Sequence, residues 1–320
     1  MNKSKRDERL GLIKINKWGD TIKIIEYNSV QDIIVEFQDK WKETKKCAWK
    51  EFKEGNIINP HIYKQRIGEI RINKQGCLMK VLDYVDCRNV IIEFQDNYRE
   101  CVKCTWANFE NGRVKNHYVP YVCGVGMEGV KYPVTINGQK TKEYASWSAM
   151  ITRCYTQTLS NGENHYRRYE DVKVCDEWLL YENFYEWLHS QENFNNWMLL
   201  DNGAVDKDIL IKGNKIYSPD TCCLVPENVN ALFLKADRAR GKYPIGVTYK
   251  TRDKVFEVQC NINGKETYLG RRSTPEQGFL LYKNYKESHI KQVAQEEYNK
   301  GNITKQCYDA MMNYEVEITD

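Results

Sequence analysis

The N-terminal third of the chain alternates apolar and polar residues, which is typical of short, half-buried strands. The alternation predicts three strands, at Ile13 and Ile15, at Ile22 and Ile24, and at Ile33, Val35 and Phe37. The same pattern recurs 57 residues later, and 20 of the 49 positions in residues 11–59 are identical in the second copy without a gap. We therefore expect two small β-rich modules, at 8–62 and 65–120. A module of this size buries little surface alone, so we expect the two to pack together.

The middle of the chain changes to a helical period. Residues 121–144 contain Asn137-Gly138, a dipeptide typical of a tight turn, and they predict a hairpin linker. The glycines of residues 123–129 have GxGxxG spacing, but a hairpin follows them instead of a helix, so no dinucleotide site is expected. Residues 145–234 begin with apolar residues at helical spacing and continue into an irregular stretch rich in polar side chains.

The C-terminal part predicts a three-stranded sheet backed by one helix. Three β-segments lie at 245–251, 254–262 and 266–271, and Asn263-Gly264 supplies the turn between the last two. Thr274-Pro275 is typical of a helix start, and the helix should run past Val293. Leu280, Tyr282 and Tyr285 are expected to cover one face of the sheet. The boundaries are 242–296 for this module and 297–320 for a helical tail.

These patterns predict an α+β, multidomain chain of 320 residues. Its composition excludes two classes of protein. Aromatic residues make up 12%, which excludes a disordered chain. No apolar run approaches the length of a membrane span, so no membrane partner is expected. The chain has 12 cysteines, and its start has no apolar export signal. We therefore expect a cytoplasmic protein with reduced thiols.

The distribution of charge points to a polyanionic partner. The net charge is only +4, but residues 235–292 contain 13 Lys and Arg against 6 Asp and Glu. A solvated charged face is the alternative. The uncovered face of the predicted sheet is expected to carry the side chains suited to double-stranded DNA, since a strand ribbon fits the major groove. The expected contacts are Tyr249, Lys250, Arg252, Lys254, Gln259, Tyr268, Arg271 and Arg272.

The order of motifs in this module resembles the APETALA2-type DNA-binding domain. The motifs are Gly246-Val247, Asn263-Gly264-Lys265 and Tyr268-Leu269-Gly270, and the resemblance covers about 244–293. It implies a sheet that binds duplex DNA.

The preceding segment, 145–234, resembles phage-type HNH homing endonucleases that carry such a C-terminal domain. The resemblance rests on residues 147–154, 169–175 and 217–222. It implies an HNH-like ββα region that holds one divalent cation, Mg²⁺ or Mn²⁺ if the protein is active. By position, Asp206 matches a metal ligand and Asn228 or Asn230 matches the second-helix ligand. The position of the general base is Lys207, where the sequence departs from the active pattern.

That departure leaves alternatives open. A lysine has a pKa of about 10.4 and is a poor base near neutrality unless it is desolvated. His165 is the histidine that can substitute, although it also suits a surface loop, and Asp206 also suits a solvated turn. The chain is thus either a metal-dependent endonuclease or a DNA-binding regulator with a degenerate nuclease domain. A third hypothesis makes the N-terminal repeats a module for an unknown protein partner.

Cysteine spacing does not favour structural zinc. The CxxC pair Cys101 and Cys104 has Thr44 and Cys47 as its counterparts in the first copy, so only one thiol is shared. The remaining candidates match no established zinc spacing, and we expect them to be buried free thiols. They are Cys154, Cys175, Cys222 and Cys223.

Overall fold

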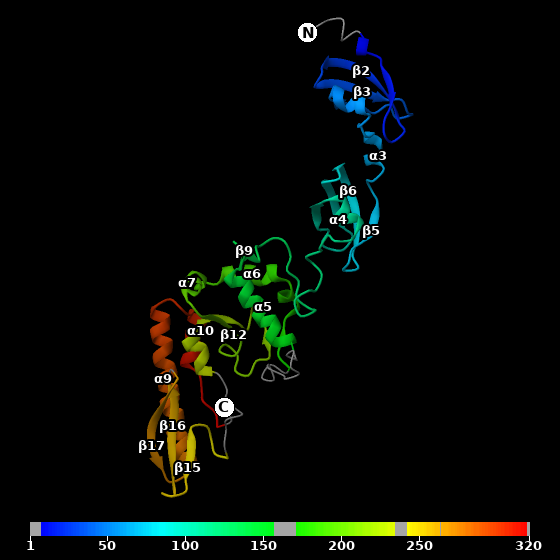
Figure 1. Ribbon diagram of the computed structural model, residues 1–320. Helices are drawn as coiled ribbons and strands as arrows, with labels where there is room; N and C mark the ends of the chain where they lie inside the picture. Colours follow the sequence, from blue (N-terminus) through cyan, green and yellow to red (C-terminus); the bar gives the residue numbers. More distant parts are fainter. Residues whose placement is uncertain (1–7, 157–170, 234–241, 263, 319–320) are drawn as a thin grey trace. The chain divides into compact units, whose positions relative to one another are not determined.

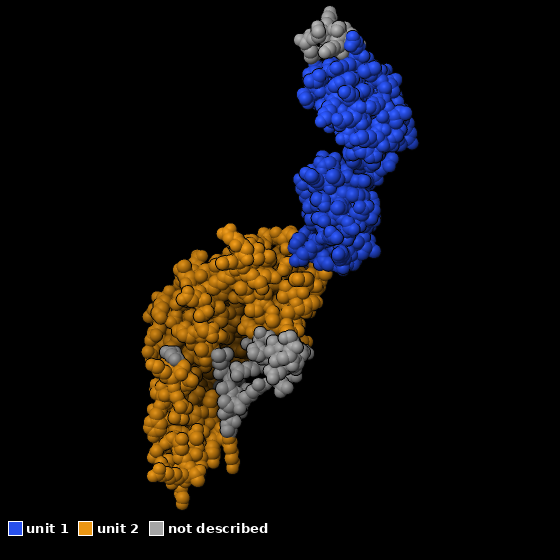
Figure 2. All heavy atoms as spheres, viewed as in Figure 1, with its two compact units in different colours: residues 1–118 blue, residues 119–320 orange. Residues whose placement is uncertain are grey.

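The computed structural model describes residues 8–156, 171–233, 242–262 and 264–318 (Figure 1). The chain combines helices with several small sheets, as an α+β protein should. It divides into two compact units, 1–118 and 119–320, coloured separately in Figure 2. Within the described ranges, every helix is too short or too polar to cross a membrane.

Unit 1 contains two four-stranded antiparallel sheets of the same order, each followed by a short helix. The first comprises β1 (Ile13–Ile15), β2 (Thr21–Ser29), β3 (Asp32–Phe37), β4 (Thr44–Cys47) and α2 (Trp49–Glu54). The second comprises β5 (Ile70–Ile72), β6 (Leu78–Asp86), β7 (Asn89–Phe94), β8 (Cys101–Cys104) and α4 (Trp106–Glu110), and α3 (Pro60–Lys64) lies between the copies. The strands predicted from the alternation are therefore present.

Each sheet encloses a buried cluster of its own. The first cluster is formed by β2 and β3 with Phe52 of α2, and the second by β6 and β7 with Phe109 of α4. The two clusters share no residue, because each copy covers its own sheet with its own helix. Ile13 and Ile15 also differ from the half-buried pattern, since they are 62% and 65% exposed.

The duplication extends to buried hydrogen bonds. Asn16 is buried, donates through Nδ2 to the carbonyl of Ile57 and accepts at Oδ1 from the amides of Trp18 and Asp20. Asn73 makes the same three bonds in the second copy, to Val114, Gln75 and Cys77. A buried amide that satisfies three backbone groups explains why the Ile-Asn-Lys string is repeated.

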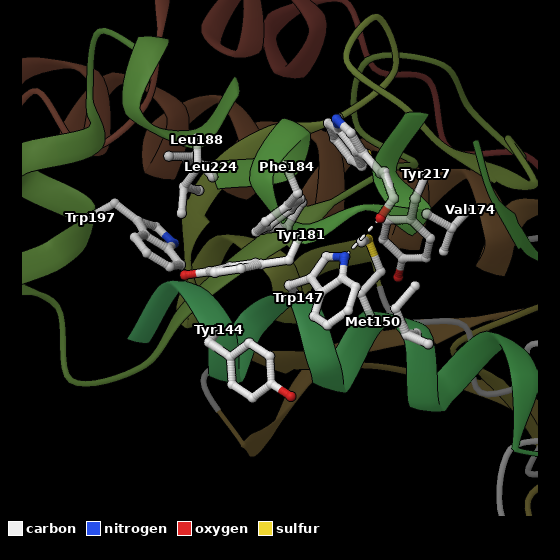
Figure 3. Close-up of a cluster of buried hydrophobic side chains, with 14 of the residues drawn as sticks. Tyr144, Trp147, Met150, Val174, Tyr181, Phe184, Leu188, Trp197, Tyr217 and Leu224 are labelled. Atoms are coloured by element: carbon white, nitrogen blue, oxygen red, sulfur yellow. Dashed lines mark hydrogen bonds between the residues drawn. The ribbon is translucent and has the colours of Figure 1, made fainter. Parts of the chain in front are cut away.

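Unit 2 begins with the predicted hairpin, β9 (Thr135–Ile136) with β10 (Gln139–Lys140), and continues into a helical core. Helices α5 (Lys142–Tyr155), α6 (Tyr181–Ser190) and α7 (Phe194–Leu199) pack around three fully buried tryptophans, Trp147, Trp178 and Trp197. The indole Nε1 of Trp147 donates to the Trp178 carbonyl at 2.7 Å (Figure 3). The turn η2 (Asp176–Leu179) and the parallel pair β11 (Lys173–Val174) and β13 (Ile216–Tyr217) complete this part.

An antiparallel pair followed by a helix lies within residues 145–234. Strand β12 (Gly203–Asp206) pairs with β14 (Cys223–Pro226), and α8 (Glu227–Asn230) and η3 (Ala231–Phe233) follow directly.

The C-terminal sheet has the order β15 (Val247–Lys250), β16 (Val255–Ile262) and β17 (Lys265–Arg272). Helix α9 (Pro275–Asn299) begins at Thr274, whose side chain accepts from the Gln277 amide as predicted. Asn263 of the predicted turn lies outside the described residues.

The face of α9 that covers the sheet differs in part from the prediction. Tyr282 is buried as expected, but Leu280 and Tyr285 are 56% and 39% exposed. Phe279 and Leu281 take their place beside the sheet, together with buried Val316 from the C-terminal tail.

The second half of α9 belongs to another core. Its residues Ile290, Val293 and Ala294 pack with β14, α8 and α10 (Lys305–Met312). In Figure 1, α9 runs from the sheet of β15–β17 to the side of α10. One helix therefore joins the C-terminal sheet to the core around β14, α8 and α10.

Candidate nucleic-acid interface and nuclease-like region

The two faces of the C-terminal sheet are defined by its register. Val247 lies opposite Val258, and α9 packs there, since a Cβ on Gly278 would lie 3.1–3.4 Å from these two side chains. Successive side chains of a strand point to opposite faces. The face away from α9, hereafter the outer face, therefore carries Thr248, Glu257 and Arg271 in one row, with Gln259 opposite Tyr268 in the next.

Basic side chains on the outer face are held by acidic ones. The guanidinium of Arg271 donates to Glu257 Oε1 at 2.7 and 3.1 Å and approaches Asp253 at 3.2 Å. Lys250 approaches Glu257 from the other side at 3.2 Å. The hydrogen bond from Arg271, more than the charge of Lys250, keeps the pKa of Glu257 below its usual range. The arrangement fixes two cations side by side on an exposed surface.

Two further cations extend from the turn between β15 and β16. Arg252 and Lys254 are exposed, and within the described ranges neither forms an ion pair. Lys254 has a φ of +52°, so the turn has a left-handed residue that is not glycine. These side chains have the reach and freedom needed to contact phosphates.

Two of the expected contacts lie on the other face. Tyr249 is directly opposite Phe256, with ring centroids 5.0 Å apart, and shares the face of Val247 and Val258. Arg272 is opposite Phe256 from the other side and donates to the Arg271 carbonyl. Lys250 and Arg271 lie on the outer face, and adjacent residues of a strand point to opposite faces. Tyr249, next to Lys250, and Arg272, next to Arg271, therefore cannot lie there. Placing Tyr249 and Arg272 on the outer face was therefore wrong.

Asp206 ends β12 and organises the turn that follows. It is 8% exposed, and its Oδ1 accepts from the amides of Asp208 and Ile209, both at 2.8 Å. Burial raises the pKa of Asp206, the two amide bonds oppose that rise, and the Asp208 charge adds to it. The carboxylate is thus a buried support for a turn, not a solvated one.

Lys207 is also engaged within the turn. It is 7% exposed, and its Nζ donates to Asp208 Oδ2 at 2.6 Å and to the Asn214 carbonyl at 2.9 Å. Both bonds use ammonium protons, whereas a general base needs a free lone pair. In this conformation Lys207 ties the loop between β12 and β13 together and does not face an open site.

The remaining candidate ligands have different surroundings. Asn228 donates to Glu297 of α9 at 3.2 Å, while Asn230 is half-buried in α8. His165 lies outside the described residues. In the parts of the chain that the structure describes, no three His, Cys, Asp or Glu side chains lie close enough to hold a metal ion.

The cysteines singled out from the sequence lie in different surroundings. Cys222 belongs to the tryptophan core, where burial raises its pKa to about 12. Cys223 belongs to the core around α9 and lies 3.7 Å from the sulfur of Cys307. Cys154 and Cys175 are partly buried at the edge of the tryptophan core.

Sequence reasoning missed the acidic members of the outer face, Glu257 and Asp253. Strand parity could have found Glu257, since it shares a face with Val255 and Gln259 along β16. Its pairing with Arg271 depends on register across β17, which the sequence does not display. Comparison with known proteins adds no assignment, because no family model, no curated protein and no solved structure matches this chain.

Proposed function

We propose that this protein binds duplex DNA through the outer face of β15–β17. The observation that carries the proposal is the grouping of cations there, with Lys250 and Arg271 on the face and Arg252 and Lys254 at its edge. The resemblance of this module to APETALA2-type domains supports the same assignment. A ribbon of strands fits the major groove, where an arginine can donate two hydrogen bonds to guanine.

The ion pairs on this face are weak enough for their cations to exchange an acidic partner for DNA. Arg271 is 49% exposed in its side chain, and exposed ion pairs contribute at most about 1 kcal/mol. Arg271 can therefore leave Glu257 for a base edge at little cost, while Glu257 keeps it extended beforehand. Arg252 and Lys254 would contact phosphates, which position the protein without selecting sequence.

The test measures binding of the full chain to a labelled duplex at several salt concentrations. Arg252→Ala with Arg271→Ala should weaken binding by roughly 1–3 kcal/mol for each side chain that contacts a base edge. Arg113→Ala, an exposed arginine of unit 1, is the matched control and should leave affinity unchanged. Equal affinity of wild type and the double variant would refute the proposal, as would binding that ignores salt.

Metal-dependent cleavage is the second candidate function. It is favoured by the antiparallel pair β12–β14 followed directly by α8, with Asp206 at the end of β12. Both amide bonds reach Oδ1 of Asp206, which leaves Oδ2 for Mg²⁺ or Mn²⁺. Asn230 would be the second ligand. Because Lys207 is held by Asp208, water activation would require that ion pair to open, or would use His165.

Cleavage of a supercoiled plasmid separates the two alternatives. Nicking that requires Mg²⁺ or Mn²⁺ and is abolished by Asp206→Asn would support a homing-endonuclease activity. Duplex binding without nicking under any of these conditions would support a DNA-binding regulator with a degenerate nuclease domain.

A further inference from the structure

Each copy in unit 1 carries, outside its core, a stacked aromatic pair of which one ring is exposed. Trp41 stacks on His61 with ring centroids 3.4 Å apart, and Tyr98 stacks on Tyr118 at 4.3 Å. Trp41 and Tyr98 are 44% and 47% exposed, and none of the four rings belongs to a buried cluster of unit 1. The pairs occupy equivalent positions, 57 residues apart.

The turn that presents the first ring is built by hydrogen bonds. Asp39 Oδ1 accepts from the amides of Trp41 and Lys42, and Asp39 Oδ2 accepts from Asn59 Nδ2 at 2.7 Å. Asn59 Oδ1 in turn accepts from the His61 amide at 2.9 Å. One carboxylate and one amide thus fix the backbone beneath both rings.

The second copy reproduces this geometry with different rings. Asp96 accepts from the amides of Tyr98 and Arg99 and from Asn116 Nδ2, and Asn116 accepts from the Tyr118 amide. Trp and His are replaced by Tyr and Tyr, so a flat stack with one exposed ring is what the two copies share. Such a ring, without a place in the core, is available to contact a ligand.

A cation follows the exposed ring in each copy. Lys42 and Arg99 have φ of +55° and +53°, and their side chains are 56% and 61% exposed. They pair with Glu36 at 3.6 Å and Glu93 at 3.0 Å, which are surface ion pairs of little energy. In the first copy, Lys40 Nζ also lies 4.3 Å from the Trp41 ring centroid.

We propose that these two sites, each an exposed ring, its stacked partner and the following cation, bind unpaired nucleotides. Aromatic side chains stack on bases of any sequence, and neighbouring cations hold the phosphates. A neutral sugar would need free carboxylates or amides beside the ring. Here those of Asp39, Asn59, Asp96 and Asn116 are already used inside the turns. The inference is independent of duplex binding by the C-terminal sheet.

The test uses the full chain with fluorescein-labelled (dT)20 and (rU)20, which distinguish DNA from RNA as the source of unpaired bases. Trp41→Ala with Tyr98→Ala should weaken binding to at least one strand by about tenfold or more, since each stacked base contributes about 1–3 kcal/mol. Trp41→Tyr should retain binding, because the second copy already has tyrosine there. Trp18→Ala is the matched control, an equally exposed tryptophan (48%) outside the stacked pairs.

Two further measurements exclude indirect effects. Lys42→Gln with Arg99→Gln should reduce the salt dependence of log K by about 1.4, or about 0.7 for each phosphate that is no longer neutralised. Thermal unfolding should show that the aromatic double variant is folded, and its duplex affinity should equal that of wild type.

Three results would overturn the proposal. They are unchanged single-strand affinity in the aromatic double variant, an equal loss in Trp18→Ala, and a ring-dependent affinity for a proline-rich peptide or an oligosaccharide in place of both strands. Failure of duplex binding alone would leave this site unaffected, so the two proposals fail separately.

Discussion

Asp206 supports a turn through one oxygen, and a pair of substitutions separates that role from its charge. Asp206→Asn keeps an oxygen acceptor at Oδ1, whereas Asp206→Ala leaves the amides of Asp208 and Ile209 without one. The Ile209 bond is buried, and an unsatisfied buried donor costs about 1–3 kcal/mol, while the Asp208 amide can reach water. We therefore expect Asp206→Ala to be less stable than Asp206→Asn by about 2 kcal/mol.

The charge of Asp206 acts in the opposite direction. Burial raises its pKa in the folded protein, so the folded state binds a proton more tightly there than the unfolded chain. Stability from this group consequently increases as the pH falls through the folded pKa and is lowest when the carboxylate is ionised. Asp206→Asn should therefore match or exceed wild type in stability at neutral pH. The advantage should diminish on acidification.

Hydrogen exchange of peptides covering β12 and β14 measures these differences locally, without assuming that the whole chain unfolds in one step. Protection equal to that of wild type in both variants would refute the role of the turn bonds. A loss in Asp206→Asn as large as in Asp206→Ala would refute the cost of the charge and would favour a carboxylate that holds a cation.

Three further predictions concern the sheets. Gly246→Ala should destabilise the C-terminal sheet by about 3 kcal/mol, because φ is +73° and a Cβ would lie 2.2 Å from the Tyr282 ring; an unchanged thermal unfolding midpoint would contradict this. Asn73→Ala should lower the stability of the second copy by about 2 kcal/mol, since three backbone partners lose their bonds and the one to the Val114 carbonyl is buried; hydrogen exchange on β5 and β6 measures it, and full protection would count against it. Glu257→Gln should tighten duplex binding and steepen its salt dependence by releasing Lys250 and Arg271, and weaker binding would show instead that Glu257 must orient Arg271.

Local signals in the sequence were sufficient for most elements of the fold. The alternation of Ile33, Val35 and Phe37 predicted β3 because a sheet with one buried face imposes that period. Thr274 and Pro275 predicted the start of α9 because a cap depends only on residues within one turn.

Which side chains of α9 pack against the sheet was less predictable. Helix α9 approaches the sheet at Gly278, where a missing side chain admits Val247 and Val258, and this sets which residues face inward. Leu280 and Tyr285 are outside that contact although they are apolar or aromatic. Composition alone does not reveal such a close approach.

The candidate site was predictable only in its basic residues. The sequence identifies Lys250 and Arg271 as cations, but their bonds to Glu257 depend on strands paired across a register shift. Asp206 and Lys207 were identified by resemblance, whereas their hydrogen bonds within one turn follow from tertiary burial. Both side chains are buried and hydrogen-bonded within this turn, and no local sequence pattern predicts that burial.

Helix α9 has a consequence for how this protein could be divided or recombined. Its 25 residues span about 37 Å, long enough to serve two cores, and Tyr314 packs against both of them. A fragment ending near residue 293 would keep the strands of the sheet. It would lack α10, against which Ile290 and Val293 pack, and it would lack Val316, which packs with Val258 and Cys260. Exchange of the C-terminal sheet between proteins would therefore have to carry α10 and the tail with it. The part of the chain that can be exchanged as a unit is therefore defined by shared burial, and it includes Val316.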